Sequence, residues 1–592
     1  MTKKGDGLAT YEPKKERRET RFGGRRQWRD DGRKRVGTNA LLELSSPEII
    51  SLWPGHSLEH GLLNLIFKMS LHMITQKANT GEDSQSIASG LSLLLTRVAG
   101  ALLQKNDSID PLDLVSPLVE LALKNDCTAL FLAKLVADIE HEESVSDHSE
   151  KLLQALFSAM ANAAVNDAPG DNVASKNISL FFTEVAKRCV SAAVKMQDTI
   201  LPALQSENYD IRKAILTCVT EIIVQKYSGH TSTVDESVRD SYLNELFFRI
   251  MDINPFVRNH VLHMWEKLVE IKAVPKRYYT AVTEAVVGRL EDKNYLVRDS
   301  ALACISVIAQ KNWFGQVLNS TLIREKFSES RDECVKIFQD TEKLENALLH
   351  QRNQFTPKED IKGDLDIVDE GLVSEDRSAE NTPPSLTDSE ITAVNKYIFY
   401  ENTLKFINLI KVGLGYSIEL LESKTERDVI ESIKLIVTCA EHHVEGGEDA
   451  FLHVLVLVFQ GEIKIQLAVR DAFIEVVFNS VSRLSASAAT RAMICAQKLI
   501  SILSKASEGE LSAVERIFLL LKSNPAYSRH ISSFFLDAVW GIAEGSLDNE
   551  ASVADRRTAM HIYSILSKFF WERRTLQAVQ HSRVYLFRGG EG

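Results

Sequence analysis

A short motif that recurs three times constrains this chain more than any other feature. The copies align without gaps and share the pattern [Ser/Asp]-x-Asn-x-x-[Ile/Val]-Arg. They are Ser206–Arg212, Asp252–Arg258 and Asp292–Arg298. The closing arginines are 46 and then 40 residues apart, a spacing typical of helical repeats with a period of about 40–47 residues. Because one such repeat cannot bury both its faces, we expect consecutive repeats to stack.

Each copy of the motif predicts the start of a helix. Asn208, Asn254 and Asn294 are expected N-caps, because an asparagine side chain can accept a hydrogen bond from a free backbone N–H of the first turn. Pro255 follows Asn254 at the first helical position, where its missing N–H costs nothing. The apolar residues after Asn208 have helical spacing: Ile211, Ala214, Ile215, Cys218, Val219, Ile222 and Ile223. With a further helix before each cap, every repeat is predicted to be a helix hairpin.

Composition also favours helices. Only 28 glycines and 13 prolines occur in 592 residues, and the chain is longer than the roughly 250–300 residues that one core can serve. The sequence predicts an all-α fold, a HEAT-type helical-repeat solenoid with a disordered basic amino-terminal tail and an acidic disordered insert. We place the tail at 1–37, a first helical array at 38–352, the insert at 353–390, and a second array with a frayed carboxyl-terminal end at 391–592.

The tail carries most of the excess positive charge. Residues 1–36 contain 13 Lys/Arg against 6 Asp/Glu, whereas the whole chain has a net charge of −12. The basic cluster consists of Arg25, Arg26, Arg29, Arg33, Lys34 and Arg35. We interpret it as a nuclear-import signal or a non-specific DNA-binding arm, with a merely solubilising tail as the alternative.

The insert is acidic, with 11 Asp/Glu against 4 Lys/Arg in residues 351–390. It holds two candidate phosphosites, Thr356 and Thr382, each followed by proline. Phosphorylation would add negative charge to a segment that is already negative, and would mainly extend it.

The repeated arginines have two interpretations. They could form a binding stripe, or they could link neighbouring repeats through pairs with the aspartates of the motif. We favour structural inter-repeat contacts for Arg212, for Asp252 and Arg258, and for Asp292 and Arg298, because arginine forms bidentate bonds with carboxylates. The candidate DNA contacts are instead Lys272, Lys276 and Arg277, basic residues around the turn at Pro275 that are expected to face solvent; solvated surface is the alternative.

The sequence lacks the motifs of common catalytic sites. It has no GxxxxGK[ST], GxGxxG, GxSxG or HExxH segment, and its seven cysteines form no CxxC pair. It also has no apolar run of about 18 residues, the length that predicts a membrane span. We therefore expect a protein that is not an enzyme and has no cofactor, metal, membrane association or small-molecule substrate.

Three sequence blocks around these motifs resemble condensin complex subunit 1, a HEAT-repeat family. They read SENYDIRKAIL, DINPFVRNHVLHMWEKLVEIKAVP and EDKNYLVRDSALACISVIAQKN. Glu329–Gln351 resembles the charged helix that precedes the acidic insert of that family, and GEIKIQLAVRDAFIEVVFN resembles its next helical block. The chain is expected to correspond to the amino-terminal half of such a subunit.

The resemblance implies a non-catalytic scaffold. A subunit of this family binds a kleisin subunit, contacts the SMC-type ATPase subunits that kleisin bridges, and contacts chromatin DNA to promote mitotic chromosome condensation. It implies localisation in the nucleus and on mitotic chromosomes, and in the cytoplasm for part of the cell cycle. Two alternatives stay open. One is another HEAT scaffold, such as a nuclear transport receptor, a cohesin-associated regulator or a phosphatase scaffold; the other is an enzyme with a cryptic site.

Overall fold

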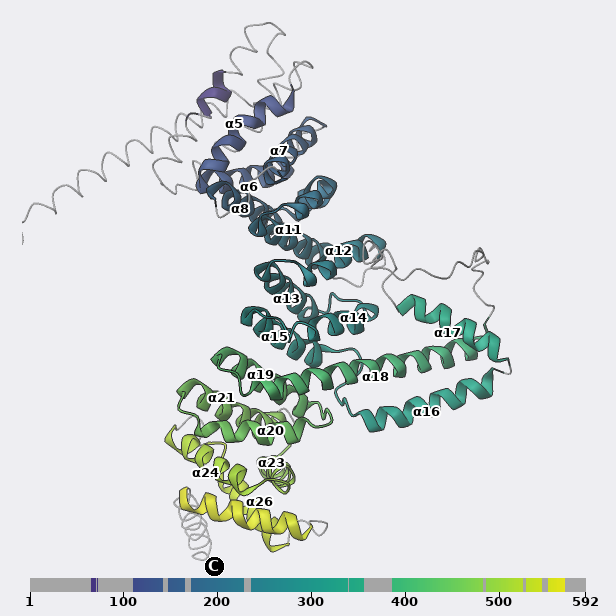
Figure 1. The fold of residues 1–592 in the computed structure, drawn as a ribbon, viewed down its shortest axis with the longest axis vertical. Coiled ribbons are helices and arrows are strands. Elements are labelled where there is room, and N and C mark those ends of the chain that lie inside the picture. Colours follow the sequence, from purple (N-terminus) through teal and green to yellow (C-terminus); the bar gives the residue numbers. More distant parts are fainter. Residues whose placement is uncertain are drawn as a thin grey trace, which may run out of the picture. The chain divides into compact units, whose positions relative to one another are not determined.

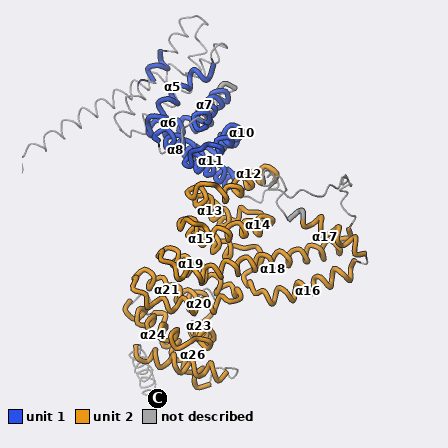
Figure 2. Tube along the Cα trace, in the orientation of Figure 1, with its two compact units in different colours: residues 1–227 blue, residues 228–592 orange. Residues whose placement is uncertain are grey.

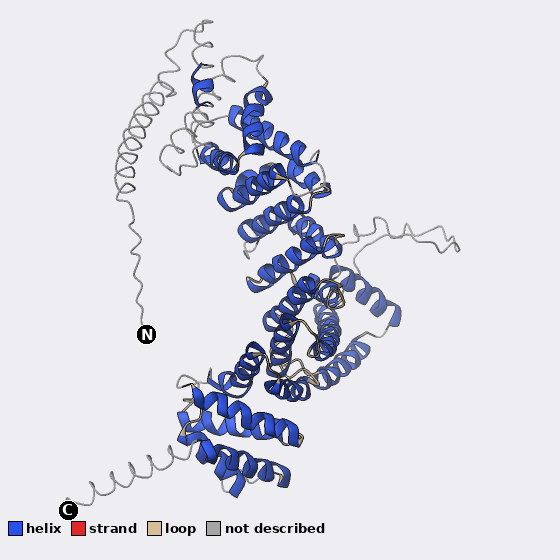
Figure 3. Cartoon of the chain, turned by 60° about the vertical axis from the view of Figure 1, so that its left-hand side comes forward, coloured by secondary structure: helices blue, strands red, loops and turns tan. Residues whose placement is uncertain are grey.

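The computed structural model describes residues 65–70, 72, 110–141, 147–165, 172–227, 236–338, 340–355, 386–482, 486–524, 529–545 and 552–569. Every regular element in these ranges is a helix, and none is a strand (Figure 3). The prediction of an all-α helical-repeat fold is therefore confirmed. The chain divides into two compact units, residues 1–227 and 228–592 (Figure 2).

The first unit consists of helices packed in two rows. Its longer helices are α5 (Pro111–Lys124), α6 (Asp126–His141), α7 (Asp147–Val165), α8 (Val173–Arg188) and α11 (Tyr209–Ile222). The short helices α9 (Val190–Lys195), α10 (Gln197–Ile200) and η1 (Leu201–Gln205) connect α8 to α11. Helices α6, α8 and α11 pack side by side in that order, and α5 packs on α7. Buried rings of Phe157, Phe181 and Phe182, with centroids 5.2–6.5 Å apart, join α7 to α8.

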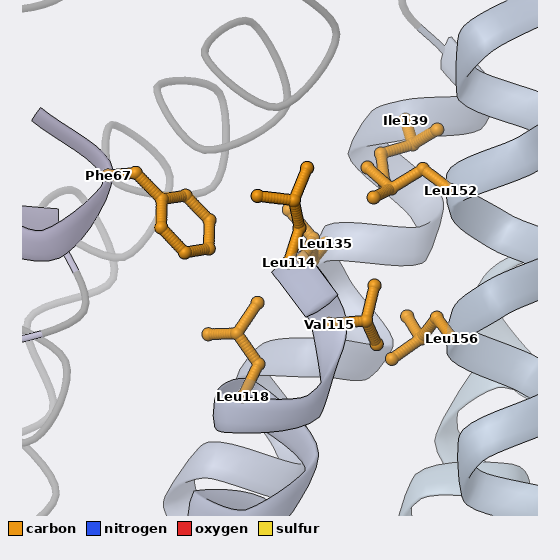
Figure 4. Close-up of a pocket in the computed structure, with 8 residues that line it drawn as sticks. All are labelled: Phe67, Leu114, Val115, Leu118, Leu135, Ile139, Leu152 and Leu156. Carbon is orange, nitrogen blue, oxygen red and sulfur yellow. The ribbon is translucent and has the colours of Figure 1, made fainter. Parts of the chain in front are cut away.

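The core of the first unit is apolar even where its packing is loose. A cavity of about 10 Å³ lies among α5, α6 and α7. Figure 4 shows the aliphatic side chains of these helices and the Phe67 ring that line it. The cavity is the smallest space that can hold one water molecule, about 10–15 Å³, and its lining offers no polar side chain to hold one. We regard it as a packing gap rather than a binding site.

The second unit consists of stacked helix hairpins (Figure 1). Its helices are α12 (Glu236–Phe248), α13 (Pro255–Glu270), α14 (Lys276–Val287), α15 (Tyr295–Lys311), α16 (Ser320–Ile337), α17 (Thr341–Phe355), α18 (Asp388–Leu420), α19 (Glu426–Glu441), α20 (Gly447–Val456), α21 (Ile463–Ile474), α23 (Ala488–Leu503), α24 (Glu508–Ser523) and α26 (Ser533–Glu544). Residues 553–569 form a further helix. Helices α13, α15, α19 and α21 pack one on the next in a first layer, and α14, α18 and α20 form the second.

One excursion interrupts this order between α15 and α19. Here the chain runs through α16, α17 and the 33-residue α18, and α16 packs along α18 in an arm that extends from the stack (Figure 1). The segment Glu329–Gln351, expected as one charged helix, is divided between α16 and α17. At the break between the two helices, Phe338 packs in a small buried core with Ala347, Val394 and Ile398. The prediction of one continuous charged helix did not include this apolar core.

Helices on both sides reach into the segment predicted as the insert, residues 353–390. Helix α17 ends at Phe355 and α18 begins at Asp388. A capping box fixes this start: the Thr387 hydroxyl accepts from the Glu390 N–H at 3.4 Å, and the Glu390 carboxylate accepts from the Thr387 N–H at 2.8 Å. The Lys343 ammonium and the Thr387 N–H, which bond the Glu390 carboxylate, lower its pKa to about 2. The acidic segment predicted as a loop, residues 353–390, thus contains the start of α18 at its carboxyl-terminal end.

Candidate functional site

The three repeat motifs build the same turn. Asn208, Asn254 and Asn294 are the N-caps of α11, α13 and α15, and their side-chain oxygens accept first-turn N–H groups at 2.8–2.9 Å. The residue two positions earlier accepts the N–H of the cap itself. Its accepting atom is Ser206 Oγ at 3.2 Å, Asp252 Oδ1 at 2.9 Å or Asp292 Oδ1 at 3.0 Å. This second bond explains why serine and aspartate share the first position of the motif.

The arginine that ends each motif holds the backbone of its own turn. Nη1 of Arg212, Arg258 and Arg298 donates to the carbonyl six residues earlier at 2.7–2.9 Å, and to the next carbonyl at 3.1–3.3 Å. Sequence reasoning missed this role, because it considered only carboxylates as partners. One guanidinium nitrogen of each arginine thereby closes the turn.

Arg258 uses its other two guanidinium nitrogens to reach the next repeat. Nε lies 2.8 Å from Asp292 Oδ2, and Nη2 lies 2.9 Å from Asp292 Oδ1, so the contact is bidentate. The side chains are 15% and 4% exposed. The arginine therefore pairs with the carboxylate of the aspartate in the following motif. From the aspartate of its own motif it contacts only the backbone carbonyl. Asp252 and Asp292 both accept the N–H of their own cap residue, and Asp292 accepts from Arg258 as well.

Arg298 makes the corresponding contact with a residue 130 positions away. Its Nη2 lies 2.6 Å from Oδ2 of Asp428, which is fully buried on α19 and also accepts from the Ser423 hydroxyl at 3.0 Å. This contact has a single hydrogen bond: Arg298 Nε and Asp428 Oδ1 have no hydrogen-bond partner within the described part of the chain. Sequence reasoning missed Asp428, because α16–α18 separate it from the repeat it contacts.

The turn before α19 is related to the other three, although Ser423–Val429 shares only its first residue with the motif. Ser423 Oγ accepts from the N–H of the N-cap residue Thr425 at 3.1 Å, as the first residue of each motif does. Val429 stands four residues after this cap, where the other motifs have arginine. The turn therefore receives an arginine from α15 but supplies none of its own.

The candidate DNA contacts divide into two groups. Lys272 and Lys276 are exposed, and their ammonium groups lie 5.6 and 5.4 Å from the centroid of the Trp313 ring. Arg277 does not face solvent as expected. It forms an ion pair with Asp240 of α12, and its side chain is only 23% exposed, because the start of α14 lies against α12. Its guanidinium is therefore committed within the unit.

Several predicted sites lie outside the described residues. They are Arg25, Arg26, Arg29, Arg33, Lys34, Arg35, Thr356 and Thr382. In the ranges that the structure describes, no three His, Cys, Asp or Glu side chains are grouped so as to hold a metal ion. Nor does any helix in those ranges combine the length and apolarity needed to cross a membrane.

Stacked helix hairpins with capped, arginine-closed turns define the class of protein as a HEAT-type helical-repeat scaffold. No protein-family model matches the chain. Solved structures similar to it include one of Kap95p with RanGDP, at 12% identity and a TM-score of 0.33, covering 93% of this chain and 69% of that one. A likeness this low adds nothing to the argument.

Curated relatives are more informative. The chain is 23% identical to condensin-1 complex subunit CAP-D2 of Arabidopsis thaliana over 513 residues, 83% of this chain and 34% of that protein. It is 23% identical to condensin complex subunit 1 of Schizosaccharomyces pombe over 419 residues, 67% of this chain and 35% of that protein. It is 32% identical to condensin complex subunit 1 of Homo sapiens over 145 residues, which are 24% of this chain and 10% of that protein. The resemblance to condensin complex subunit 1 is confirmed. The chain spans about a third of the length of the first two relatives.

Removing Arg258 should destabilise the second unit. Arg258→Ala removes the bidentate partner of the buried Asp292 carboxylate and leaves only Arg289, whose Nη1 lies 3.8 Å from Oδ2. It is expected to lower the free energy of unfolding by about 3–5 kcal/mol. The matched control is Lys464→Ala, which removes an ion pair to Glu426 at 3.0 Å whose lysine is 75% exposed. It should cost at most about 1 kcal/mol. Urea unfolding followed by circular dichroism measures both, and an unchanged midpoint for Arg258→Ala would contradict the structural role.

Acid should weaken the same contact. Burial raises the pKa of Asp292, but the hydrogen bonds from Arg258 and the Asn294 N–H, with the charges of Arg258 and Arg289, outweigh burial and hold this pKa below its ordinary value. The contribution to stability is therefore full above the unfolded pKa of about 4, and is lost as the pH falls through the lower folded pKa. Asp292→Asn should remove this part of the pH dependence of the urea midpoint. If the midpoints of both proteins fell in parallel on acidification, Asp292 would not be the linked group.

Proposed function

We propose that this chain is a non-catalytic scaffold subunit of the condensin complex that binds kleisin and chromatin DNA and promotes mitotic chromosome condensation. The observation that carries the proposal is the similarity to condensin-1 complex subunit CAP-D2 of Arabidopsis thaliana over 83% of the chain. In this role the chain contacts the SMC-type ATPase subunits through the assembled complex, without a cofactor or small-molecule substrate. It acts in the nucleus and on mitotic chromosomes, and resides in the cytoplasm for part of the cell cycle.

The turns of the second unit supply a surface suited to an extended partner. Ion pairs join the starts of successive helices: Arg258 with Asp292, Arg298 with Asp428, and Lys464 with Glu426. The starts of α13, α15, α19 and α21 therefore follow one another along one edge of the layer. Large apolar side chains are exposed at several of these starts: Met251 (61%), Ile253 (94%), Phe256 (46%), Tyr295 (44%), Phe459 (56%) and Ile463 (71%). Spaced apolar contacts of this kind suit an extended peptide such as a kleisin segment.

DNA contact is assigned to Lys272 and Lys276. Both ammonium groups are exposed and positioned near the Trp313 ring, and no ion pair with a carboxylate engages either within the described residues. Arg277 is left out of this assignment because Asp240 already neutralises it. Two lysines give a weak, sequence-independent contribution that depends on salt.

Co-purification tests the scaffold assignment. Co-expressed with a tagged kleisin and the two SMC-type ATPase subunits, the chain should be retained on the tag. Ile253→Asp should weaken retention, because it places a charge in the apolar row without disturbing the core. The control is Val553→Asp, a side chain 79% exposed on the helix of residues 553–569. Retention of a nuclear-import cargo in place of kleisin would instead favour the transport-receptor alternative.

Salt dependence tests the DNA assignment. The double variant Lys272→Ala/Lys276→Ala should reduce the slope of log K against log salt for duplex DNA by about 1.8, since each phosphate contact contributes about 0.9. Lys293→Ala/Lys424→Ala removes two exposed lysines from the opposite ends of the hairpins and should leave the slope unchanged. Equal slopes for both variants and the parent would place DNA contacts elsewhere.

A further inference from the structure

A basic cavity lies in the last part of the second unit, away from the repeat turns. It has a volume of about 250 Å³ and is bordered by α23 and α26, which pack on each other (Figure 1). Its lining includes Arg491, Arg529 and His530, and none of the described residues that line it is acidic. Phe478 and Phe535, with ring centroids 5.3 Å apart, form an apolar wall.

Among the described residues, no carboxylate forms an ion pair with either arginine of this cavity. Arg491 donates through Nη1 to the Ala486 carbonyl at 2.6 Å, which holds the side chain in place but does not neutralise it. Most other arginines of this unit that contribute to its packing, such as Arg258, Arg277 and Arg352, are paired with acids. Two unpaired guanidinium groups at one cavity therefore concentrate positive charge there.

The remaining polar groups at the cavity also favour an anion. Ser532 is the N-cap of the 12-residue helix α26, so the positive end of the helix dipole lies at the cavity. The His530 ring lies beside the Phe478 ring, with centroids 5.3 Å apart and the planes tilted by 31°. Burial, together with the Arg529 charge, lowers the pKa of His530, which shows that the surroundings disfavour a further positive charge.

We propose that this cavity binds the phosphate group of a phosphorylated serine or threonine side chain. A phosphate monoester carries close to two negative charges at neutral pH and offers three acceptor oxygens, which two arginine forks can share. The cavity is smaller than the roughly 300–1,000 Å³ of sites for drug-sized ligands, so it fits a single phosphorylated side chain better than a nucleotide. The Phe478 and Phe535 rings would cover the carbon atoms that carry the phosphate.

Calorimetric titration of the full chain with O-phosphoserine tests this site, with serine as the matched blank and inorganic phosphate as a separate arm. We expect saturable 1:1 binding of O-phosphoserine and none of serine. Arg491→Gln and Arg529→Gln should each weaken binding about tenfold or more, since each removes charged hydrogen bonds. Arg516→Gln removes an exposed arginine of α24 that does not line the cavity, and should change nothing.

Each result of the titration either supports or overturns the proposal that the cavity binds a phosphorylated side chain. No saturable binding, or an equal loss in Arg516→Gln, would overturn the proposal. Binding of inorganic phosphate without O-phosphoserine would exclude the side-chain ligand. Arginine-dependent binding of a short single-stranded DNA, with O-phosphoserine inactive, would reassign the cavity to nucleic acid. Since Arg529 is exposed and holds no backbone group, Arg529→Gln remains a valid test if Arg491→Gln unfolds.

Discussion

The bidentate bond between Arg258 and Asp292 connects a helix cap, a turn and the contact between two repeats. The same guanidinium closes the turn before α13 through two backbone carbonyls and reaches the aspartate of the following turn. That aspartate in turn accepts the N–H of the Asn294 cap. Cap, turn and inter-repeat contact therefore form one network. A buried ion pair is weak evidence of net stability, but its directional bonds fix which turn lies beside which.

The same chemistry explains how the stack tolerates a large excursion. Helices α16–α18 separate α15 from α19 along the chain, yet α19 packs on α15 as the next repeat would. Arg298 finds its carboxylate on α19, at Asp428. This contact is less complete than the first, since one nitrogen and one oxygen lack partners among the described residues. Val429 then takes the arginine position, so this series of contacts ends at α19.

The proposed functions use different parts of the second unit. The edge where the arginine contacts lie also exposes apolar side chains such as Ile253 and Ile463, which suit a partner peptide. Lys272 and Lys276 lie at the other ends of these hairpins, around the turn between α13 and α14. The basic cavity between α23 and α26 is a third surface. A repeat scaffold can separate its contacts in this way because each repeat packs mainly on its neighbours.

The sequence alone determined the features that depend on neighbouring residues. Asn208, Asn254 and Asn294 cap helices through bonds to residues two positions later, and the apolar stripe after Asn208 is buried. These are short-range effects of backbone hydrogen bonding and the 3.6-residue period. Even there, composition concealed the capping box at Thr387, because acidic residues that suggest a loop also favour a helix start.

Only the tertiary structure decided which distant residues meet. Asp292 and Asp428 are the partners of Arg258 and Arg298, and Asp240 pairs with Arg277. Arg491 and Arg529 line one cavity, whose described lining contains no acid. Residues from 34 to 130 positions apart are involved, and no local pattern specifies such pairs. Their meeting follows from the packing of one helix layer on the next, which buries apolar faces first and places the charged side chains where that packing leaves them.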